Sequence, residues 1–140
     1  MVVVDASIWV AAFRKKDKFY ADSNKLLRDL FSSKESIAIP EIAFAEVAGA
    51  LKRITGDTEV VNRAMLNMER FKPKILDVDH LNVGALAKQI AINHSIRGAD
   101  ACYLAVAQLT ESKELHTTDK DQKTAFEKIS KAWKSKPLGG

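Results

Sequence analysis

The sequence predicts an α/β fold in which helices cover a mainly parallel sheet, and three observations support this prediction. Short apolar runs with the length of strands alternate with longer segments whose apolar residues recur at helical spacing. The first run, residues 2–4, is uniformly apolar, as expected of a parallel strand that helices cover on both faces. Hydrophobic residues make up 46% of the 140 residues and charged residues 29%, which is the composition of a soluble globular protein.

The N-terminal half is expected to contain two strands and four helices. Pro40 suits the first turn of a helix, and Gly56 suits the C-terminal end of the same helix. The next helix should stop before Pro73. The expected elements are a strand over 2–4, a helix over 7–13, a charged loop over 14–18, a helix over 20–31, a strand over 36–39, and helices over 41–55 and 59–71.

The C-terminal half continues the alternation. Asp79 could cap the first helix of this half, and the last helix carries Phe126, Ile129 and Trp133 on one apolar stripe. The order of elements predicts one domain over residues 1–134 and a loose tail over 135–140. The expected elements are a strand over 74–79, a helix ending near residue 93, an almost entirely apolar helix over 100–109, a strand over 114–119 and a helix over 122–134.

Charge and composition limit the class of protein. The net charge of +4 and the pI near 9.2 favour a polyanionic partner without requiring one. The sequence has no secretory signal pattern, and no apolar run approaches the roughly 20 residues of a membrane-spanning helix. The only cysteine, Cys102, lies in an apolar run, which excludes an intrachain disulfide and favours a reducing compartment. We therefore expect a cytoplasmic protein that does not enter a membrane.

Three aspartates are expected at one edge of the sheet. Asp5 ends the first strand, Asp119 ends the last strand in HTTD, and Asp100 opens the apolar helix. Ligands of open parallel sheets bind beyond the carboxyl ends of the strands, where loops and helix N-termini converge. The positive end of the helix dipole also favours an ionised carboxylate at Asp100. These three acids are therefore predicted to face one site.

Glu46 has the most informative surroundings of any acid. The residues three and four positions away along its predicted helix, Ile42, Ala43, Gly49 and Ala50, are all small or apolar. A charged glutamate buried there without a partner would be costly. Glu46 must therefore be neutral, solvated in a cleft or paired with a group from another element, and a metal ion shared with the aspartates would satisfy it.

Each aspartate also has a purely structural interpretation. Asp5 and Asp100 suit the N-terminal ends of helices, and Asp119 suits a turn in TDKD. Asp121 follows closely enough to assist from just outside the site. Two further aspartates are weaker candidates: Asp77, and Asp79, which is better interpreted as a helix cap.

The available residue types favour one kind of metal chemistry. Four carboxylates supply the oxygen ligands that Mg²⁺ and Mn²⁺ prefer. One cysteine and three scattered histidines, His80, His94 and His116, do not suggest a zinc site. Without a histidine pair, a water activated by the metal is the natural nucleophile, and a second cation could stabilise the leaving oxygen. The fitting reaction is phosphodiester hydrolysis.

The four acids would divide the roles in such a site. Asp5 is expected to bridge metal ions, and Asp100 and Asp119 are expected to be metal ligands. Glu46 would be a ligand or would orient the attacking water.

Four sequence blocks carry a resemblance to a known family. They are VVVDASIWV, EIAFAEVAGAL, RGADACYLAVAQL and LHTTDKD, and in this order they resemble the acidic motifs of PIN-domain ribonucleases. The third and fourth blocks are most similar to VapC-like toxins of type II toxin–antitoxin modules. The resemblance implies a PIN-like three-layer α/β/α sandwich and a catalytic, metal-binding quartet of Asp5, Glu46, Asp100 and Asp119, with Ser7 and Thr117 as accessory polar groups. Ala6 departs from the family, which often has a hydroxyl residue there.

The basic residues near these acids are candidates for RNA binding. Arg14 and Lys15 follow the first helix, and Arg97 precedes Asp100, so these side chains could contact phosphates. Lys15 and its neighbour Lys16 are equally well explained as solvated surface charges. Trp9 could stack on a base, but between Ile8 and Val10 it is more often a core residue.

The resemblance further implies an RNA substrate, a cytoplasmic homodimer and a cognate antitoxin that holds the activity off. Two alternatives remain open: a PIN-fold nuclease of RNA processing, and a non-cleaving PIN-like module that binds RNA or a protein partner. A haloacid-dehalogenase-type phosphatase would need an aspartate two residues after Asp5, where this sequence has Ser7. A response-regulator receiver would need an adjacent acid pair at the end of the first strand.

Overall fold

A four-stranded sheet lies at the centre of the computed structural model, which describes residues 1–76 and 82–135. The strand order is β3-β2-β1-β4, and every pairing is parallel. β1 lies between β2 and β4, with Val2 opposite both Ile37 and Glu114. The strands are β1 (Val2–Val4), β2 (Ile37–Pro40), β3 (Lys74–Leu76) and β4 (Glu114–His116).

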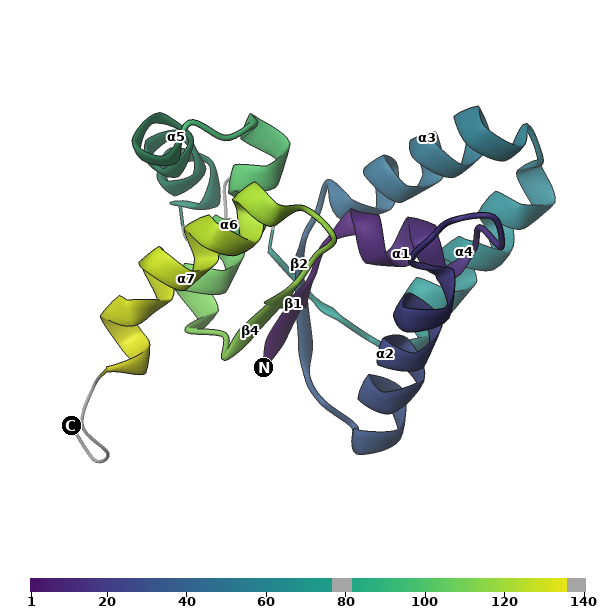
Figure 1. The fold of residues 1–140 in the computed structure, drawn as a ribbon, viewed down its shortest axis with the longest axis horizontal. Helices are drawn as coiled ribbons and strands as arrows, with labels where there is room; N and C mark the ends of the chain where they lie inside the picture. Colours follow the sequence, from purple (N-terminus) through teal and green to yellow (C-terminus); the bar gives the residue numbers. More distant parts are fainter. Residues whose placement is uncertain (77–81, 136–140) are drawn as a thin grey trace.

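Helices cover both faces of the sheet, so the fold is the predicted three-layer α/β/α sandwich (Figure 1). One layer contains α1 to α4, and the other contains α5 to α7, with α6 packed directly on β1, β2 and β4. The helices of the described residues are α1 (Ala6–Ala12), α2 (Tyr20–Ser33), α3 (Ala43–Thr55), α4 (Thr58–Arg70), α5 (Val83–His94), α6 (Gly98–Thr110) and α7 (Lys120–Lys134).

The core explains why two segments are almost entirely apolar. β1 is covered by helices on both faces, and its three valines are at most 1% exposed. α6 packs between the sheet, α5 and α7, and its residues from Tyr103 to Ala107 are fully buried. Neither segment has a solvent face on which polar residues would be favourable.

The two tryptophans belong to this packing. Trp9 is fully buried, its Nε1 donates to the Val4 carbonyl oxygen at 3.3 Å, and its ring meets Phe71 edge-on with centroids 5.2 Å apart. Trp133 packs on Phe126 with ring centroids 6.1 Å apart. Trp9 therefore lies in the core and not on a surface where it could stack on a base.

The expected start of the helix after Pro40 is wrong, and α6 and α7 each begin two residues earlier than expected. Pro40 is the last residue of β2, and α3 begins at Ala43. The pairing of β1 with β2 ends at Ala38, so the missing N–H of Pro40 breaks no ladder bond to β1. Gly56 does end α3, in the left-handed conformation with φ of 65°, as predicted.

The sequence also predicts the last strand, over 114–119, to be longer than it is. β4 ends at His116, because Asp119 leaves the sheet to cap α7, and β3 is described only as far as Leu76. Three residues considered above, Asp77, Asp79 and His80, lie outside the described residues. Within residues 1–76 and 82–135, no helix combines the length and apolar character needed to cross a membrane.

Candidate active site

The four predicted acids lie at the N-terminal ends of four helices. Asp5 caps α1, Glu46 and Asp100 lie in the first turns of α3 and α6, and Asp119 caps α7. The positive ends of helix dipoles stabilise negative charge at such positions. Because β1 and β4 are neighbours and α6 packs on both, segments far apart in the sequence reach one edge of the sheet.

Asp5 is the most enclosed of the four, with a residue exposure of 5%. Its Oδ2 accepts hydrogen bonds from the backbone N–H of Ser7 at 3.1 Å and from the Thr117 hydroxyl at 3.2 Å. Its Oδ1 accepts from the Gln122 side-chain amide at 3.4 Å. These three donors compensate the carboxylate for its loss of water and fix its orientation.

The predicted accessory residues belong to the same network. The Ser7 hydroxyl lies 3.5 Å from the Thr117 hydroxyl and accepts from the backbone N–H of Thr118 at 3.1 Å. Thr117 also accepts from the backbone N–H of Asp119 at 3.0 Å. Ser7 and Thr117 therefore connect the end of β1 to the loop that carries Asp119.

Glu46 is paired with a group from another element, which was one of the predicted solutions. The Tyr103 hydroxyl of α6 donates to Glu46 Oε1 at 2.8 Å. Burial raises the pKa of Glu46, and repulsion from Asp5 and Asp100 raises it further, while the Tyr103 hydrogen bond lowers it. Burial and the neighbouring Glu46 charge raise the pKa of Tyr103 far above its usual value, so the tyrosine stays protonated and donates.

Asp100 is 15% exposed and pairs with the arginine that precedes its helix. Arg97 Nε donates to Asp100 Oδ2 at 3.1 Å, although the arginine side chain as a whole is 81% exposed. Burial raises the pKa of Asp100, the Arg97 contact opposes this rise, and repulsion from Asp5 and Asp119 adds to it. Each of the four acids therefore interacts electrostatically with at least one other.

The donor set fits a hard divalent cation. All four side chains offer oxygen ligands, and their mutual repulsion is what a Mg²⁺ or Mn²⁺ ion would relieve. As the side chains are oriented, no group of three or more acids, histidines or cysteines among the described residues is close enough to enclose a metal ion. To complete a ligand shell beside Asp5, Glu46 and Asp100, which are each held by one side-chain hydrogen bond, would have to adopt other rotamers.

Asp119 caps a helix instead of starting the turn that was considered for it, and its charge also acts on Asp100. Its Oδ1 accepts from the backbone N–H groups of Asp121 at 2.9 Å and Gln122 at 3.0 Å, which caps α7. Asp121 itself is exposed and lines a separate cavity with His94 and Ser95 of the α5 end. The structure therefore does not bring the Asp121 side chain into the quartet.

The predicted RNA-binding residues differ in how close they lie to the acids. Arg97 contacts Asp100 directly. Arg14 lies in the loop after α1, 3.9 Å from Asp17, and Lys15 is exposed beside it. Within the described residues, neither Arg14 nor Lys15 forms an ion pair with a quartet acid.

Sequence reasoning missed two buried polar residues that organise the site. Gln122 is 1% exposed, and its amide donates to the Asp100 carbonyl oxygen at 3.2 Å as well as to Asp5, while its Oε1 accepts from the Thr117 hydroxyl at 2.8 Å. Tyr103 is fully buried and holds Glu46. Gln122 stands four residues before Phe126 on the apolar stripe of the last helix, and a polar residue at such a position was the available signal.

The comparison with known families agrees with this geometry. The family model described as PIN domain matches residues 2–130. The chain belongs to the PIN domain family. A PIN domain match over this range contains all four acids and both missed residues. No curated protein sequence is similar enough to count as a relative.

Solved structures share the fold of this chain. One of them is VapC20 of Mycobacterium tuberculosis, described as a toxin that cleaves the sarcin-ricin loop. The two PIN domains superpose with a TM-score of 0.73 at 19% sequence identity, over 89% of this chain and 95% of VapC20. The likeness shows a common fold.

Proposed function

We propose that this PIN domain is a metal-dependent endoribonuclease that hydrolyses RNA phosphodiester bonds. The observation that carries the proposal is the convergence of Asp5, Glu46, Asp100 and Asp119 at four helix N-termini, where burial and mutual repulsion raise the pKa values of Glu46 and Asp100. Clusters of this kind are typical of functional sites because repulsion without a ligand costs stability. Membership of the PIN domain family supports the class of nuclease.

The residues would take the following roles. Asp5, fixed by three hydrogen bonds, would be the central ligand of the cation, with Asp100 and Asp119 beside it. Glu46, which Tyr103 holds in place, would be a further ligand or would orient the attacking water. A bound Mg²⁺ or Mn²⁺ ion would supply charge to neutralise the phosphate and would lower the pKa of a water molecule. The exposed guanidinium of Arg97 would contact a phosphate of the RNA.

We further propose that the protein is the toxin of a toxin–antitoxin pair. The resemblance of its third and fourth acidic blocks to VapC-like toxins supports this role, as does the fold that it shares with VapC20. A cognate antitoxin, a homodimer and a location in the cytoplasm are then expected. An RNA-processing nuclease with the same site is the alternative within the enzyme class.

The test compares wild-type protein with Asp100→Asn on labelled single-stranded and structured RNAs in the presence of Mg²⁺ or Mn²⁺. The substitution keeps the size of the side chain and removes one charge, so cleavage should fall roughly a hundredfold or more. RNA binding should persist, because one repulsive carboxylate is lost. Asp29→Asn, at an exposed acid of α2 paired with Lys25, is the matched control and should cut like wild type.

Two outcomes would contradict the proposal. Equal cutting by wild type, Asp100→Asn and chelator-treated protein would identify a contaminating nuclease. Specific RNA binding with no cutting under any metal condition would support the non-cleaving module instead.

A further inference from the structure

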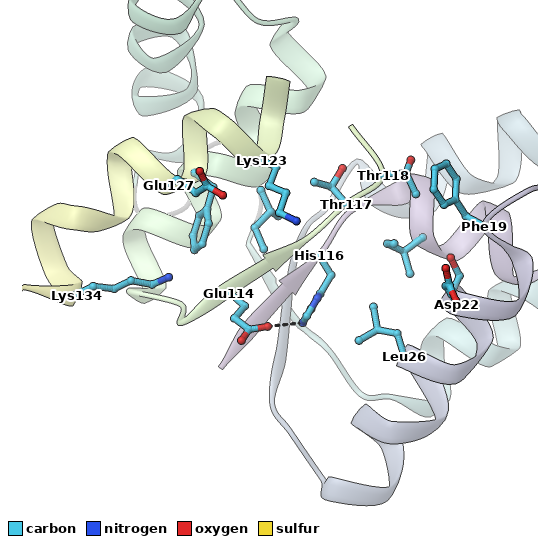
Figure 2. Close-up of a pocket in the computed structure, with 14 residues that line it drawn as sticks. Phe19, Asp22, Leu26, Glu114, His116, Thr117, Thr118, Lys123, Glu127 and Lys134 are labelled. Atoms are coloured by element: carbon cyan, nitrogen blue, oxygen red, sulfur yellow. Dashed lines mark ion pairs between the residues drawn. The ribbon is translucent and has the colours of Figure 1, made fainter. Parts of the chain in front are cut away.

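A groove between α1 and α3 leads away from the candidate active site. It has a volume of about 460 Å³, and Ser7, Glu46 and Thr118 line the end at which the site lies. Thr118 and Phe19 separate this groove from a second cavity beside β4, since both residues line both spaces (Figure 2). Small or apolar side chains of α1 and α3 form much of the remaining wall; they are Ala6, Val10, Ala45 and Ala50.

The direction of the groove follows from the direction of α3. Glu46 lies in the first turn of this helix, beside the other acids, and Arg53 lies in its last turn, about 10 Å further along the axis. Figure 1 shows α3 leading away from the end of the sheet on the side opposite to α5, α6 and α7. A strand bound in the groove would therefore leave the quartet on this side.

Arg53 is the cation among the described residues that line the groove. Its side chain folds back along α3 towards the quartet, because a methyl group at Gly49 would lie 3.3 Å from Arg53 Nη1. Apart from the adjoining backbone of the helix, no other atom of the described residues lies within 4 Å of that point. Glycine is unfavourable in the middle of a helix, and here it leaves room for the guanidinium.

The guanidinium of Arg53 has no partner within residues 1–76 and 82–135, where it forms no hydrogen bond, ion pair or ring contact. Its neighbour Lys52 differs, because the lysine ammonium donates to Thr58 Oγ1 at 2.7 Å and to the Gly56 carbonyl oxygen at 3.3 Å. Lys52 therefore stabilises the turn between α3 and α4, whereas the charge of Arg53 is available to a ligand.

The acid at the far side of the groove does not compensate Arg53. Asp17 accepts a hydrogen bond from the backbone N–H of Phe19 at 2.8 Å and lies 3.9 Å from the guanidinium of Arg14. Its charge is thus directed to groups of its own loop. A guanidinium in a groove that leads to a metal-binding quartet suits a phosphate, which it can bind through two parallel hydrogen bonds.

We propose that Arg53 binds the phosphate of a nucleotide next to the cleaved bond, so that the RNA strand lies in the groove between α1 and α3. The inference rests on the proposed function, since it places the strand in relation to a bond cut at the quartet. Arg97 precedes α6 and belongs to the other helix layer. The two arginines would therefore hold the strand on both sides of the cut.

The test measures RNA binding in the presence of a chelator, which stops the proposed metal-dependent cleavage. A single-stranded hexanucleotide is titrated into wild type, Arg53→Ala and the matched control Arg63→Ala, an exposed arginine of α4 outside the groove. Arg53→Ala should bind about fivefold more weakly, and its plot of log K against log salt should be shallower by about 0.7, as expected for one phosphate contact with a single strand. Arg63→Ala should bind like wild type. Equal affinities and slopes for wild type and Arg53→Ala would overturn the proposal.

A second set of RNAs identifies the phosphate. One phosphate at a time is replaced by an uncharged methylphosphonate, and the change in affinity is compared between wild type and Arg53→Ala. At the contacted position the replacement should weaken binding to wild type about fivefold and leave binding to Arg53→Ala unchanged, because the partner charge is already absent. Replacements that weaken both proteins equally at every position would show that Arg53 contacts no phosphate.

Gly49→Leu separates the position of the arginine from its presence. Leucine forms helices better than glycine, and its side chain would occupy the place of the Arg53 guanidinium. The melting temperature should therefore stay the same or rise, while the affinity for the hexanucleotide falls as in Arg53→Ala. A Gly49→Leu protein that binds RNA like wild type would contradict the proposed role of the groove.

Cleavage kinetics distinguish failure of this inference from failure of the proposed function. Arg53→Ala should raise the KM for an RNA oligonucleotide and leave kcat unchanged, because the contact is equally strong before and during the reaction. Cutting by Arg53→Ala with the KM of wild type would remove the groove contact and leave the nuclease intact. RNA binding that depends on Arg53, in a protein that cuts no RNA, would remove the nuclease and leave the groove as a binding site.

Discussion

Gln122 shows how a neutral side chain can organise a cluster of negative ones. Its amide connects Asp5 at the end of β1, the start of α6 and the Thr117 hydroxyl. A lysine or arginine at this position would also pair with Asp5, but its charge would compete with a cation for the same carboxylates. The amide fixes the carboxylate and leaves the net negative charge of the quartet available for a metal ion.

We therefore predict that Gln122→Met impairs both folding and cleavage. Methionine has a similar length but cannot form the hydrogen bonds, so the free energy of unfolding should fall by about 1–3 kcal/mol. RNA cleavage per folded molecule should also fall, because Asp5 and Thr117 lose their common partner. Gln108→Met, at an exposed glutamine of α6, is the control for urea unfolding and cleavage. A Gln122→Met protein with wild-type stability would show that these bonds contribute little.

The four acids were predictable from the sequence, whereas their partners were not. Asp5 ends an apolar strand, Glu46 interrupts an apolar helix pattern, and Asp100 opens an apolar helix. Asp119 follows the last predicted strand, and positions of this kind are visible in the sequence. Tyr103 is an aromatic residue in an apolar helix, so its sequence position shows packing and gives no sign of the hydroxyl contact with Glu46 across 57 residues.

At the scale of the element, the residue that caps α7 has both a structural and an electrostatic role. Asp119 caps the helix through two backbone N–H groups and also repels Asp100 across the site. Asparagine caps a helix about as well as aspartate, whereas alanine does not. The capping role and the role of the negative charge can therefore be separated by the choice of substitution.

We predict that Asp119→Asn keeps the stability of the protein and loses cleavage. Asp119→Ala should lose cleavage and also about 1 kcal/mol of unfolding free energy, because the cap is removed. Thermal unfolding and RNA cleavage on the same preparations would check both statements. Normal cutting by Asp119→Asn would exclude Asp119 as a metal ligand.

The order and type of elements were predictable because each has a clear hydrophobic period. Apart from the end of α3 at Gly56, several ends of elements were not predictable, because they depend on contacts distant in sequence. Pro40 has the local properties of a first helical residue, yet it continues β2 because Leu76 of β3 lies opposite. In the sequence, Asp119 resembles the last residue of a strand. In the structure, the backbone leaves the strand before Thr117, and Asp119 lies at the N-terminus of α7.

At the scale of the whole molecule, the quartet makes stability depend on pH. The pKa values of Glu46 and Asp100 are raised above the usual carboxyl values of 4.5 and 3.8. Between the usual and the raised values, the folded protein binds more protons than the unfolded chain, so stability falls as the pH rises through this window. Above the window both carboxylates are ionised and their repulsion opposes folding.

We predict that millimolar Mg²⁺ or Mn²⁺ raises the melting temperature above this pH window and has little effect below it, where the carboxylates are protonated. Glu46→Gln should melt higher than wild type in metal-free buffer at neutral pH, because one repulsive charge is removed. Its response to metal should be smaller. Calorimetry at several pH values would check these outcomes, and a metal response that does not depend on pH would contradict them.

The central position of β1 has a consequence for the protein during its synthesis. β1 lies at the start of the sequence, but its partner strand β4 and the loop that carries Asp119 come after α6. A nascent chain that has emerged only as far as α6 holds Asp5, Glu46 and Asp100 but lacks β4, Thr117 and Gln122. Since domains are made at about 5–20 residues per second, the ribosome carries an incomplete site for most of translation. The proposed RNA cleavage would therefore begin only when nearly the whole domain has been made.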